Sequence, residues 1–152
     1  MNYKKVKEYI SNNEGCKQKP YMDTKGYWTI GKGHRLFGKP SDEMIKRGIS
    51  EEEIEKLFHQ DILTAHMACK NAFNGFDSFP EDAKIVLMDM AFNIGEGSDT
   101  RKTGVEGFDN MQKAVEEKNW NEAAWQMLDS KYAKEDVPER AIRNALILRK
   151  VI

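Results

Sequence analysis

Two carboxylates and a hydroxyl near the start of the chain have the residue types that glycoside hydrolysis requires. Glu14 follows a short amphipathic segment, Asp23 lies in a turn-forming sequence, and Thr29 lies on the strand-like segment after that turn. Glycosidases use one carboxyl group to protonate the leaving oxygen and a second to serve the opposite face of the sugar. Taken alone, the pair has a structural alternative, a helix-end charge and an ordinary turn aspartate, because 25 of the 152 residues are acidic.

Other catalytic signatures in the chain are incomplete. There is no HExxH motif, and His59 and His66 lie about 10 Å apart along a predicted helix, too far for an ordinary zinc pair. Residues 95–99 resemble a nucleophile elbow but lack its final glycine and the preceding strand. The segment Gly31-Lys32-Gly33 lacks the third glycine and the Walker hydroxyl of a phosphate loop. The sequence therefore predicts neither a metal nor a cofactor.

The elements that must position these residues can be predicted from local patterns. Helical spacing of apolar residues predicts a helix over 3–12 that stops at Glu14-Gly15. Glycines among aromatic and β-branched residues predict a β-hairpin or a three-stranded sheet within Lys17–Leu36. Ser50 and Glu53 form a capping box that opens a long helix to about Phe73. Further helices are expected after Ser41, from Ser78–Glu81 onward, and over 105–117, 120–130 and 138–149.

This order of elements predicts an α+β fold that is mostly α-helical. We expect a single domain with a small lobe at about 14–50, a connecting helix over 51–73, and a helical lobe made of 1–13 and 74–152. On the last helix, the apolar pattern places Ile142, Leu146 and Leu148 inward.

The composition indicates a soluble globular protein. The 24 basic and 25 acidic residues give a net charge of −1, which argues against a general nucleic-acid binder. No apolar run approaches the roughly 18 residues that span a bilayer, and no signal-peptide core follows the N-terminal lysines. We therefore expect synthesis in a cytoplasm and no membrane insertion. Cys16 and Cys69 are too few for a disulfide framework, and two reduced thiols are favoured over a single bridge.

A longer string of residues surrounds the two carboxylates. The chain reads Glu14-Gly15, then Tyr21-Met22-Asp23, then Gly26, then Thr29-Ile30-Gly31-Lys32-Gly33-His34. This string resembles the active-site signature of the T-even phage lysozymes, the muramidases of glycoside hydrolase family 24. Later segments resemble further motifs of that family in the same order: Glu55–Asp61, Met90–Gly95, Thr103–Asn110, Trp120–Ala124 and Pro138–Ala141. The resemblance implies a lysozyme-like fold with an active-site cleft between the two lobes.

The same resemblance assigns roles to individual residues. It implies that Glu14 is the general acid, which protonates the glycosidic oxygen between N-acetylmuramic acid and N-acetylglucosamine. Asp23 would stabilise the oxocarbenium-like transition state and assist the attacking water, which Thr29 would hold. Such enzymes invert the anomeric carbon, which requires carboxyl groups roughly 6.5–9.5 Å apart.

Three supporting residues also match the family. Arg140 matches an arginine that contacts the acid, and His34 with Asp61 matches a structural ion pair between the small lobe and the long helix. The Arg140 contact creates a conflict, because an ion pair favours ionised Glu14 whereas a general acid must hold its proton. We expect partial burial, or exclusion of water by the substrate, to offset it.

The candidate substrate-binding residues match the family only in part. Phe92 matches a family aromatic at the saccharide site, with packing in the core as its alternative, and Asn93 is the polar neighbour that could bond an acetamido group. Cleft positions that are Leu, Ser and Asn in the T-even enzymes are Arg35, Met111 and Gln126 here. The loop Gly95–Lys102 is longer than in those enzymes, so the rim of the cleft is expected to differ.

Two functions from different classes remain. The first is an active peptidoglycan hydrolase of the endolysin type, a monomer made in a host cytoplasm and released by a holin to act on the bacterial wall from the periplasm. The second is a lysozyme-fold protein that binds glycan or another partner without hydrolysis. Because Glu14, Asp23 and Thr29 are all present, the sequence favours hydrolysis.

The distribution of charge predicts a dependence on salt. Residues 1–35 hold eight basic and three acidic groups, and residues 131–152 hold six and three, whereas residues 36–130 hold ten and nineteen. Since Arg140 is expected beside Glu14, the two basic ends should meet and could face an anionic wall. Wall clearing, followed by turbidity at constant pH, is therefore expected to slow as ionic strength rises from about 0.01 M to about 0.15 M, because screening shortens the Debye length from roughly 30 Å to roughly 8 Å. An unchanged rate over that range would contradict this prediction.

Overall fold

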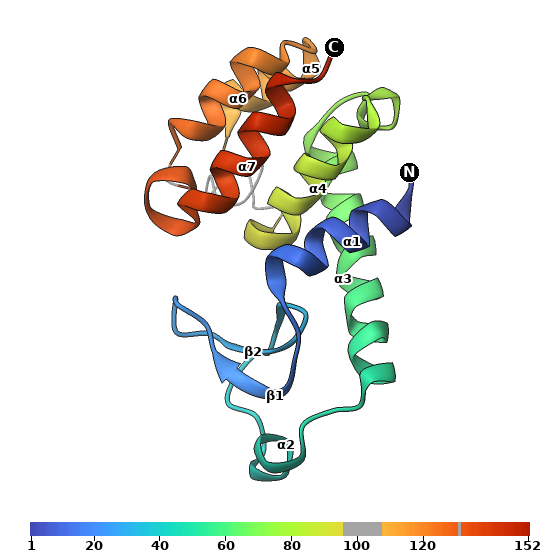
Figure 1. The fold of residues 1–152 in the computed structure, drawn as a ribbon, viewed down its shortest axis with the longest axis vertical. Helices are drawn as coiled ribbons and strands as arrows, with labels where there is room; N and C mark the ends of the chain where they lie inside the picture. The colour runs from blue at the N-terminus through green and yellow to red at the C-terminus, as the bar shows by residue number, and fades with distance from the viewer. Residues whose placement is uncertain (96–107, 131) are drawn as a thin grey trace.

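The computed structural model describes residues 1–95, 108–130 and 132–152 of the chain. The segment expected to form a long loop, from residue 96 to 102, and the first residues of the helix expected over 105–117 lie outside the described residues. Figure 1 shows a small sheet and helix α2 at one end of the molecule, helices α4 to α7 at the other, and the long helix α3 running between them. These are called the sheet end and the helical end below.

Helix α1 (Tyr3–Glu14) leads directly into the sheet. Asn2 caps its start by accepting a hydrogen bond from the backbone N–H of Lys5, and Gly15 ends it at φ +70°. The helix therefore runs two residues beyond the predicted 3–12, so that Glu14 is its last residue.

The sheet has three antiparallel strands in the order β1-β2-β3. These are β1 (Lys17–Met22), β2 (Trp28–Gly31) and β3 (His34–Arg35), which confirms the three-stranded alternative. The predicted turn after β1 is present, since the backbone N–H of Gly26 donates to the carbonyl of Asp23 at 3.1 Å.

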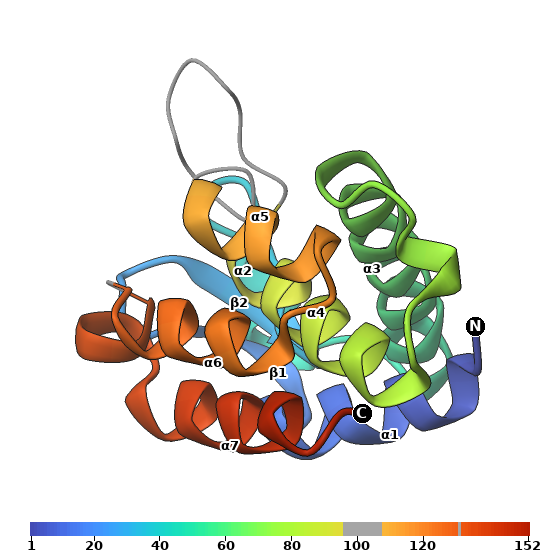
Figure 2. The same ribbon diagram turned by 90° about the horizontal axis from the view of Figure 1, so that it is seen from above.

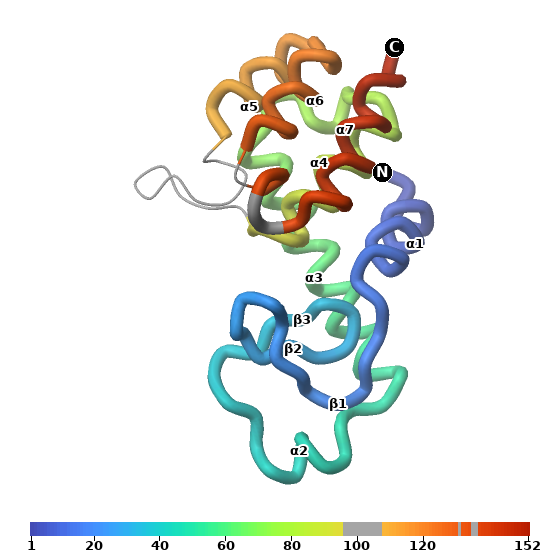
Figure 3. Tube along the Cα trace, turned by 60° about the vertical axis from the view of Figure 1, so that its left-hand side comes forward, coloured from blue at the N-terminus to red at the C-terminus, as the bar shows by residue number. Residues whose placement is uncertain are grey.

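Helices α2 (Asp42–Arg47) and α3 (Glu51–Ala72) follow the sheet. Ser50 caps α3 as predicted, because its Oγ accepts a hydrogen bond from the backbone N–H of Glu53 at 3.2 Å. His34 Nδ1 lies 2.8 Å from Asp61 Oδ2, so the expected contact joins β3 to the middle of α3. The backbone trace in Figure 3 shows β3 beside this helix. Burial raises the pKa of the Asp61 carboxyl, and the hydrogen bond and charge of His34 offset only part of that rise.

Helix α4 (Glu81–Ile94) is the centre of the helical end, as Figure 2 shows. It contacts α1, α3 and α7, and nine consecutive residues, 83–91, are buried. The remaining elements are a 3₁₀-helix (Phe76–Ser78), α5 (Asp109–Glu116), α6 (Trp120–Leu128), a π-helix (Tyr132–Asp136) and α7 (Pro138–Arg149). The sequence patterns did not predict the π-helix.

The buried face of α7 differs from the prediction. Ile142 and Leu146 are 50% and 51% exposed, so their inward placement was wrong, whereas Leu148 is buried as expected. The buried face consists of small or polar residues together with Leu148: Arg140, Ala141, Asn144, Ala145 and Leu148. Alanines allow close approach to α4 and α6, and the two polar residues find partners inside the protein, which the apolar pattern alone does not reveal.

Two further findings concern the cysteines and the membrane. Cys16 is exposed and Cys69 is buried, and both are free thiols, as favoured from the sequence. Burial raises the pKa of the Cys69 thiol. Within the described part of the chain, every helix is too short or too polar to cross a membrane.

Gly48, which ends helix α2, provides a test of how the sheet end is packed. It adopts φ +68°, and a Cβ there would lie 2.2 Å from the backbone oxygen of Gln18. Gly15 has a similar φ of +70° but open space around its Cβ position. In urea unfolding, Gly15→Ala is expected to cost about 1–2 kcal/mol through backbone strain alone. Gly48→Ala should cost at least about 1 kcal/mol more, because the clash forces the backbone to move; equal losses would contradict this packing.

Candidate active site

Glu14 is held between the helical end and the sheet. Its side chain is 15% exposed, and Oε1 accepts a hydrogen bond from Arg140 Nη1 at 2.7 Å. On its other side lies the turn between β2 and β3, where a Cβ on Gly33 would come within 2.5 Å of Glu14 Oε2. Only a glycine lets the backbone approach the carboxylate this closely, and its φ of +72° also favours glycine.

Asp23 is fixed by the turn that it forms. Its Oδ1 accepts hydrogen bonds from the backbone N–H groups of Lys25 at 2.9 Å and Tyr27 at 2.8 Å. The turn-aspartate interpretation that the sequence left open is therefore correct. It is compatible with a catalytic role, because both hydrogen bonds use the same oxygen and hold the other in a defined direction.

Thr29 is buried on β2, opposite Tyr21 on one neighbouring strand and Arg35 on the other. Its hydroxyl donates to the carbonyl of Tyr27 at 3.1 Å, which leaves the hydroxyl oxygen as an acceptor. Burial raises the pKa of the Tyr21 phenol, and the negative charges of Glu14 and Asp23 raise it further. The structure thus brings both carboxylates close enough to act on Tyr21, a motif residue to which the sequence assigned no role.

Arg140 contacts Glu14 as the resemblance implied, but it also has a second partner, Asp89, with which it makes two hydrogen bonds instead of one. Its Nε and Nη2 donate to the two oxygens of Asp89 at 2.8 and 2.7 Å. The arginine is 7% exposed. Burial alone would lower the pKa of Arg140, but the hydrogen bonds and charge of Asp89, followed by those of Glu14, raise it above its usual value.

Asp89 is the residue that sequence reasoning missed. It is 0% exposed and also accepts hydrogen bonds from Asn13 Nδ2 at 3.0 Å and Asn144 Nδ2 at 2.8 Å. A signal was present, because Asp89 stands alone as an acidic residue in the apolar stretch Ile85–Ile94. A charge on such a helix is rarely buried without a partner.

The candidate substrate-binding residues occupy different environments. Phe92 is half-buried and packs edge-to-face on Phe58 with ring centroids 5.7 Å apart, so it contributes to the core while keeping some surface. Asn93, the next residue on α4, is also half-buried. Arg35 is exposed and its guanidinium lies 3.6 Å from the ring centroid of Tyr27, beside the Asp23 turn.

The two candidates on helices α5 and α6 offer less free surface to a substrate. Met111 on α5 is 1% exposed and belongs to the hydrophobic core, which contradicts its predicted contact with substrate, because a buried side chain offers no surface to a ligand. Gln126 on α6 is half-buried, and its Nε2 donates to Glu122 Oε1 at 2.8 Å.

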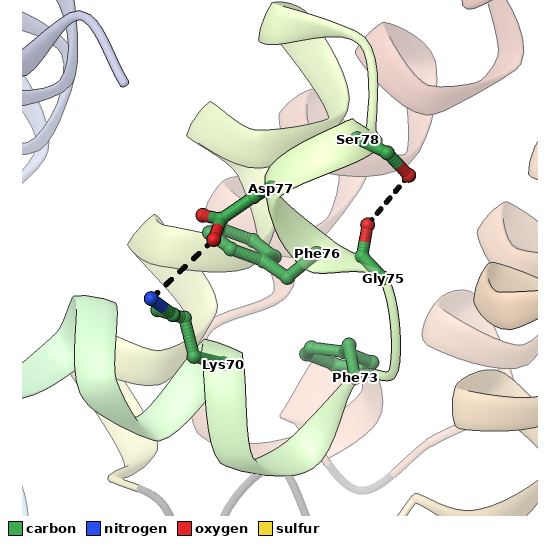
Figure 4. Close-up of a pocket in the computed structure, with 6 residues that line it drawn as sticks. All are labelled: Lys70, Phe73, Gly75, Phe76, Asp77 and Ser78. Atoms are coloured by element: carbon green, nitrogen blue, oxygen red, sulfur yellow. Dashed lines mark hydrogen bonds and ion pairs between the residues drawn. The ribbon is translucent and has the colours of Figure 1, made fainter.

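Two hollows lie apart from these residues. Figure 4 shows one of about 260 Å³ at the connection between α3 and α4, where Lys70 Nζ lies 3.3 Å from Asp77 Oδ2 and Ser78 Oγ donates to the carbonyl of Gly75. The other is lined by Asn121, Trp125, Leu128 and Arg149 on α6 and α7. Neither includes a predicted site residue. Among the residues that the structure describes, no three His, Cys, Asp or Glu side chains are grouped to hold a metal ion.

An α+β fold of this order, with a glutamate at the end of the first helix and an aspartate in the following turn, defines a lysozyme-like protein. The sequence profile of the phage lysozyme family matches residues 11–145, and the chain belongs to that family. It is 30% identical to Probable T4-type lysozyme 2 of Dictyostelium discoideum, over 91% of this chain and 89% of that protein. It is also 32% identical to the SAR-endolysin of Escherichia phage P1, over 58% of this chain and 44% of that protein.

The close approach of Gly33 to Glu14 gives a test of the site geometry. Gly33→Ala is expected to displace the Glu14 carboxylate and lower glycosidase activity by about 10²-fold, since displacements near 1 Å have effects of that size. Gly38→Ala is the matched control, because Gly38 also has a positive φ, +109°, but open space at its Cβ position. Peptidoglycan-clearing rates and unfolding temperatures of both variants separate the two effects. Equal activity losses would show that the Gly33 approach does not matter.

Proposed function

We propose that this protein is an endolysin-type muramidase that cleaves the β-1,4 bond between N-acetylmuramic acid and N-acetylglucosamine with inversion. Membership of the phage lysozyme family supports a glycosidase that acts on peptidoglycan. The observation that carries the finer proposal is the placement of Glu14, which binds Arg140 and lies against Gly33, together with Asp23, whose charge acts on the same tyrosine, Tyr21, as that of Glu14.

In the proposed reaction, protonated Glu14 donates its proton to the glycosidic oxygen while the bond from that oxygen to the anomeric carbon breaks. Water attacks the opposite face of the sugar, and its proton passes to Asp23. Thr29 orients that water by accepting a hydrogen bond from it, because its own proton is directed to the carbonyl of Tyr27. The products are two shorter glycan chains. One has a new reducing end, and the other has a hydroxyl group where the glycosidic oxygen was.

We further propose that Phe92, Asn93, Arg35 and Gln126 contact the glycan or its peptides. Each keeps some exposed surface. The natural setting that fits this activity is phage lysis, in which the protein acts as a monomer on the bacterial wall after a holin gives it access from the host cytoplasm.

Glu14→Gln provides the direct test, because it preserves size and the contact with Arg140 but removes the proton donor. Clearing of purified peptidoglycan is expected to fall by about 10²-fold or more. Glu8→Gln on the exposed face of the same helix makes the same chemical change away from the site and should keep the wild-type rate. Glu14→Gln with full activity would sink the assignment of the acid.

The chemistry of the new chain ends identifies the reaction. Muramic acid reducing ends would establish a muramidase, whereas anhydro ends would show a lytic transglycosylase. If the folded wild-type protein binds peptidoglycan but releases no new ends, the protein is a glycan-binding member of the family and the proposed hydrolysis is wrong.

A further inference from the structure

Asp89 places a second carboxylate in the interior, next to the arginine that holds Glu14. Its two oxygens receive four hydrogen bonds, two from Arg140 and one each from Asn13 and Asn144. Four donors on one side chain match a carboxylate, which only accepts. Arg140 is consequently oriented by Asp89, and Nη1 is the nitrogen that it directs to Glu14.

A second layer of hydrogen bonds holds this arrangement. Asn144 Oδ1 accepts from the Tyr9 hydroxyl at 2.6 Å, and Asn144 Nδ2 also lies 3.2 Å from the Tyr132 hydroxyl. Arg143 Nη2 donates to Asn13 Oδ1 at 2.8 Å. Burial raises the pKa of both tyrosines, and the charge of Asp89 raises them further, so both stay neutral hydrogen-bonding groups over the physiological range. Helices α1, α4 and α7 and the π-helix are tied together at this point.

The charge balance of the three central groups depends on Glu14. Arg140 contributes one positive charge and Asp89 one negative charge, so the group is neutral when Glu14 is protonated and carries one excess negative charge when Glu14 is ionised. An uncompensated charge is unfavourable where water is largely excluded. With Asp89 absent, Glu14 would be the counter-ion of Arg140, and the ionised form would be favoured instead.

We propose that Asp89 is a positioning residue that supplies the counter-charge of Arg140, so that Glu14 keeps the proton it needs as general acid. This inference rests on the role proposed above for Glu14. It answers the conflict seen in the sequence between an arginine contact and a general acid, and it does so with a residue outside the family motifs that carried the resemblance.

A substitution at Asp89 acts on Glu14 through Arg140, which contacts both carboxylates. At the sheet end, Glu14, Asp23 and Cys16 all act on the Tyr21 phenol. On α7, Arg143 donates to Asn13, the residue before Glu14. Arg140 faces Glu14 from α7. A shift in the pH dependence of an Asp89 variant therefore reports the loss of the Asp89 charge together with any change in the Arg140 contact, and a variant that returns the charge separates the two.

The test is the pH profile of peptidoglycan hydrolysis by Asp89→Asn, measured at constant ionic strength. The substitution removes the charge and keeps the size, so Arg140 stabilises ionised Glu14 more strongly and the proton is lost at lower pH. The alkaline limb of the profile is expected to move to lower pH by about one unit or more. Asp82→Asn, an exposed aspartate on the same helix, is the matched control and should leave the limb in place.

Relocating the carboxylate gives a rescue that a purely structural role would not produce. Asn13 contacts Asp89 Oδ1, so Asn13→Asp combined with Asp89→Asn returns a negative charge to the network and should move the limb back toward the wild-type position. Asn13→Asp alone adds a charge and should move the limb to higher pH. This single variant also tests the proposal if Asp89→Asn does not fold, as judged by thermal unfolding.

The outcomes separate this proposal from the proposed function. If Glu14→Gln is inactive but folded Asp89→Asn keeps the wild-type alkaline limb, the role of Asp89 is wrong and the acid assignment stands. If Asp89→Asn cannot fold and Asn13→Asp leaves the limb unmoved, the role of Asp89 is equally wrong. If Glu14→Gln is fully active, the proposed function itself fails.

Discussion

The rest of the structure depends on the two ion pairs of Arg140, whose guanidinium is nearly buried. A charge excluded from water must be met by partners inside the protein, and here these come from distant parts of the chain: Glu14 on α1 and Asp89 on α4. Their meeting fixes the end of α1 against α4 and α7. Because β1 begins directly after α1, the same contact determines where the sheet lies relative to the helical end.

The sheet has its own connections to the long helix. His34 pairs with Asp61, and Lys32 pairs with Glu55 one to two turns earlier on α3 while its ammonium lies 4.9 Å from the centre of the Phe58 ring. These contacts flank Gly33, the residue that lies against Glu14. The turn that encloses the acid is therefore anchored on both sides, which explains how a two-residue strand such as β3 can hold a defined position.

Local signals predicted much of the fold. The Ser50 capping box, the turn glycine Gly26 and the stop at Gly15 act within a few residues of themselves, and each was found where the sequence placed it. The apolar pattern predicted the wrong buried face for helix α7. Ile142 and Leu146 face outward on α7 because Ala141 and Ala145 fit against neighbouring helices and Arg140 and Asn144 reach Asp89. Met111 was expected at the substrate and lies in the core instead.

The sequence by itself determined the catalytic candidates and the family, because Glu14, Asp23 and Thr29 stand in a compact motif whose spacing is fixed by one helix end and one turn. Only the tertiary structure decided which charged groups surround the candidate acid, Glu14. Asp89 and Arg140 are 51 residues apart along the chain, and Arg140 is 126 residues from Glu14. Coulomb interactions and hydrogen bonds depend on distance in space, so no local pattern could show that two carboxylates share one arginine.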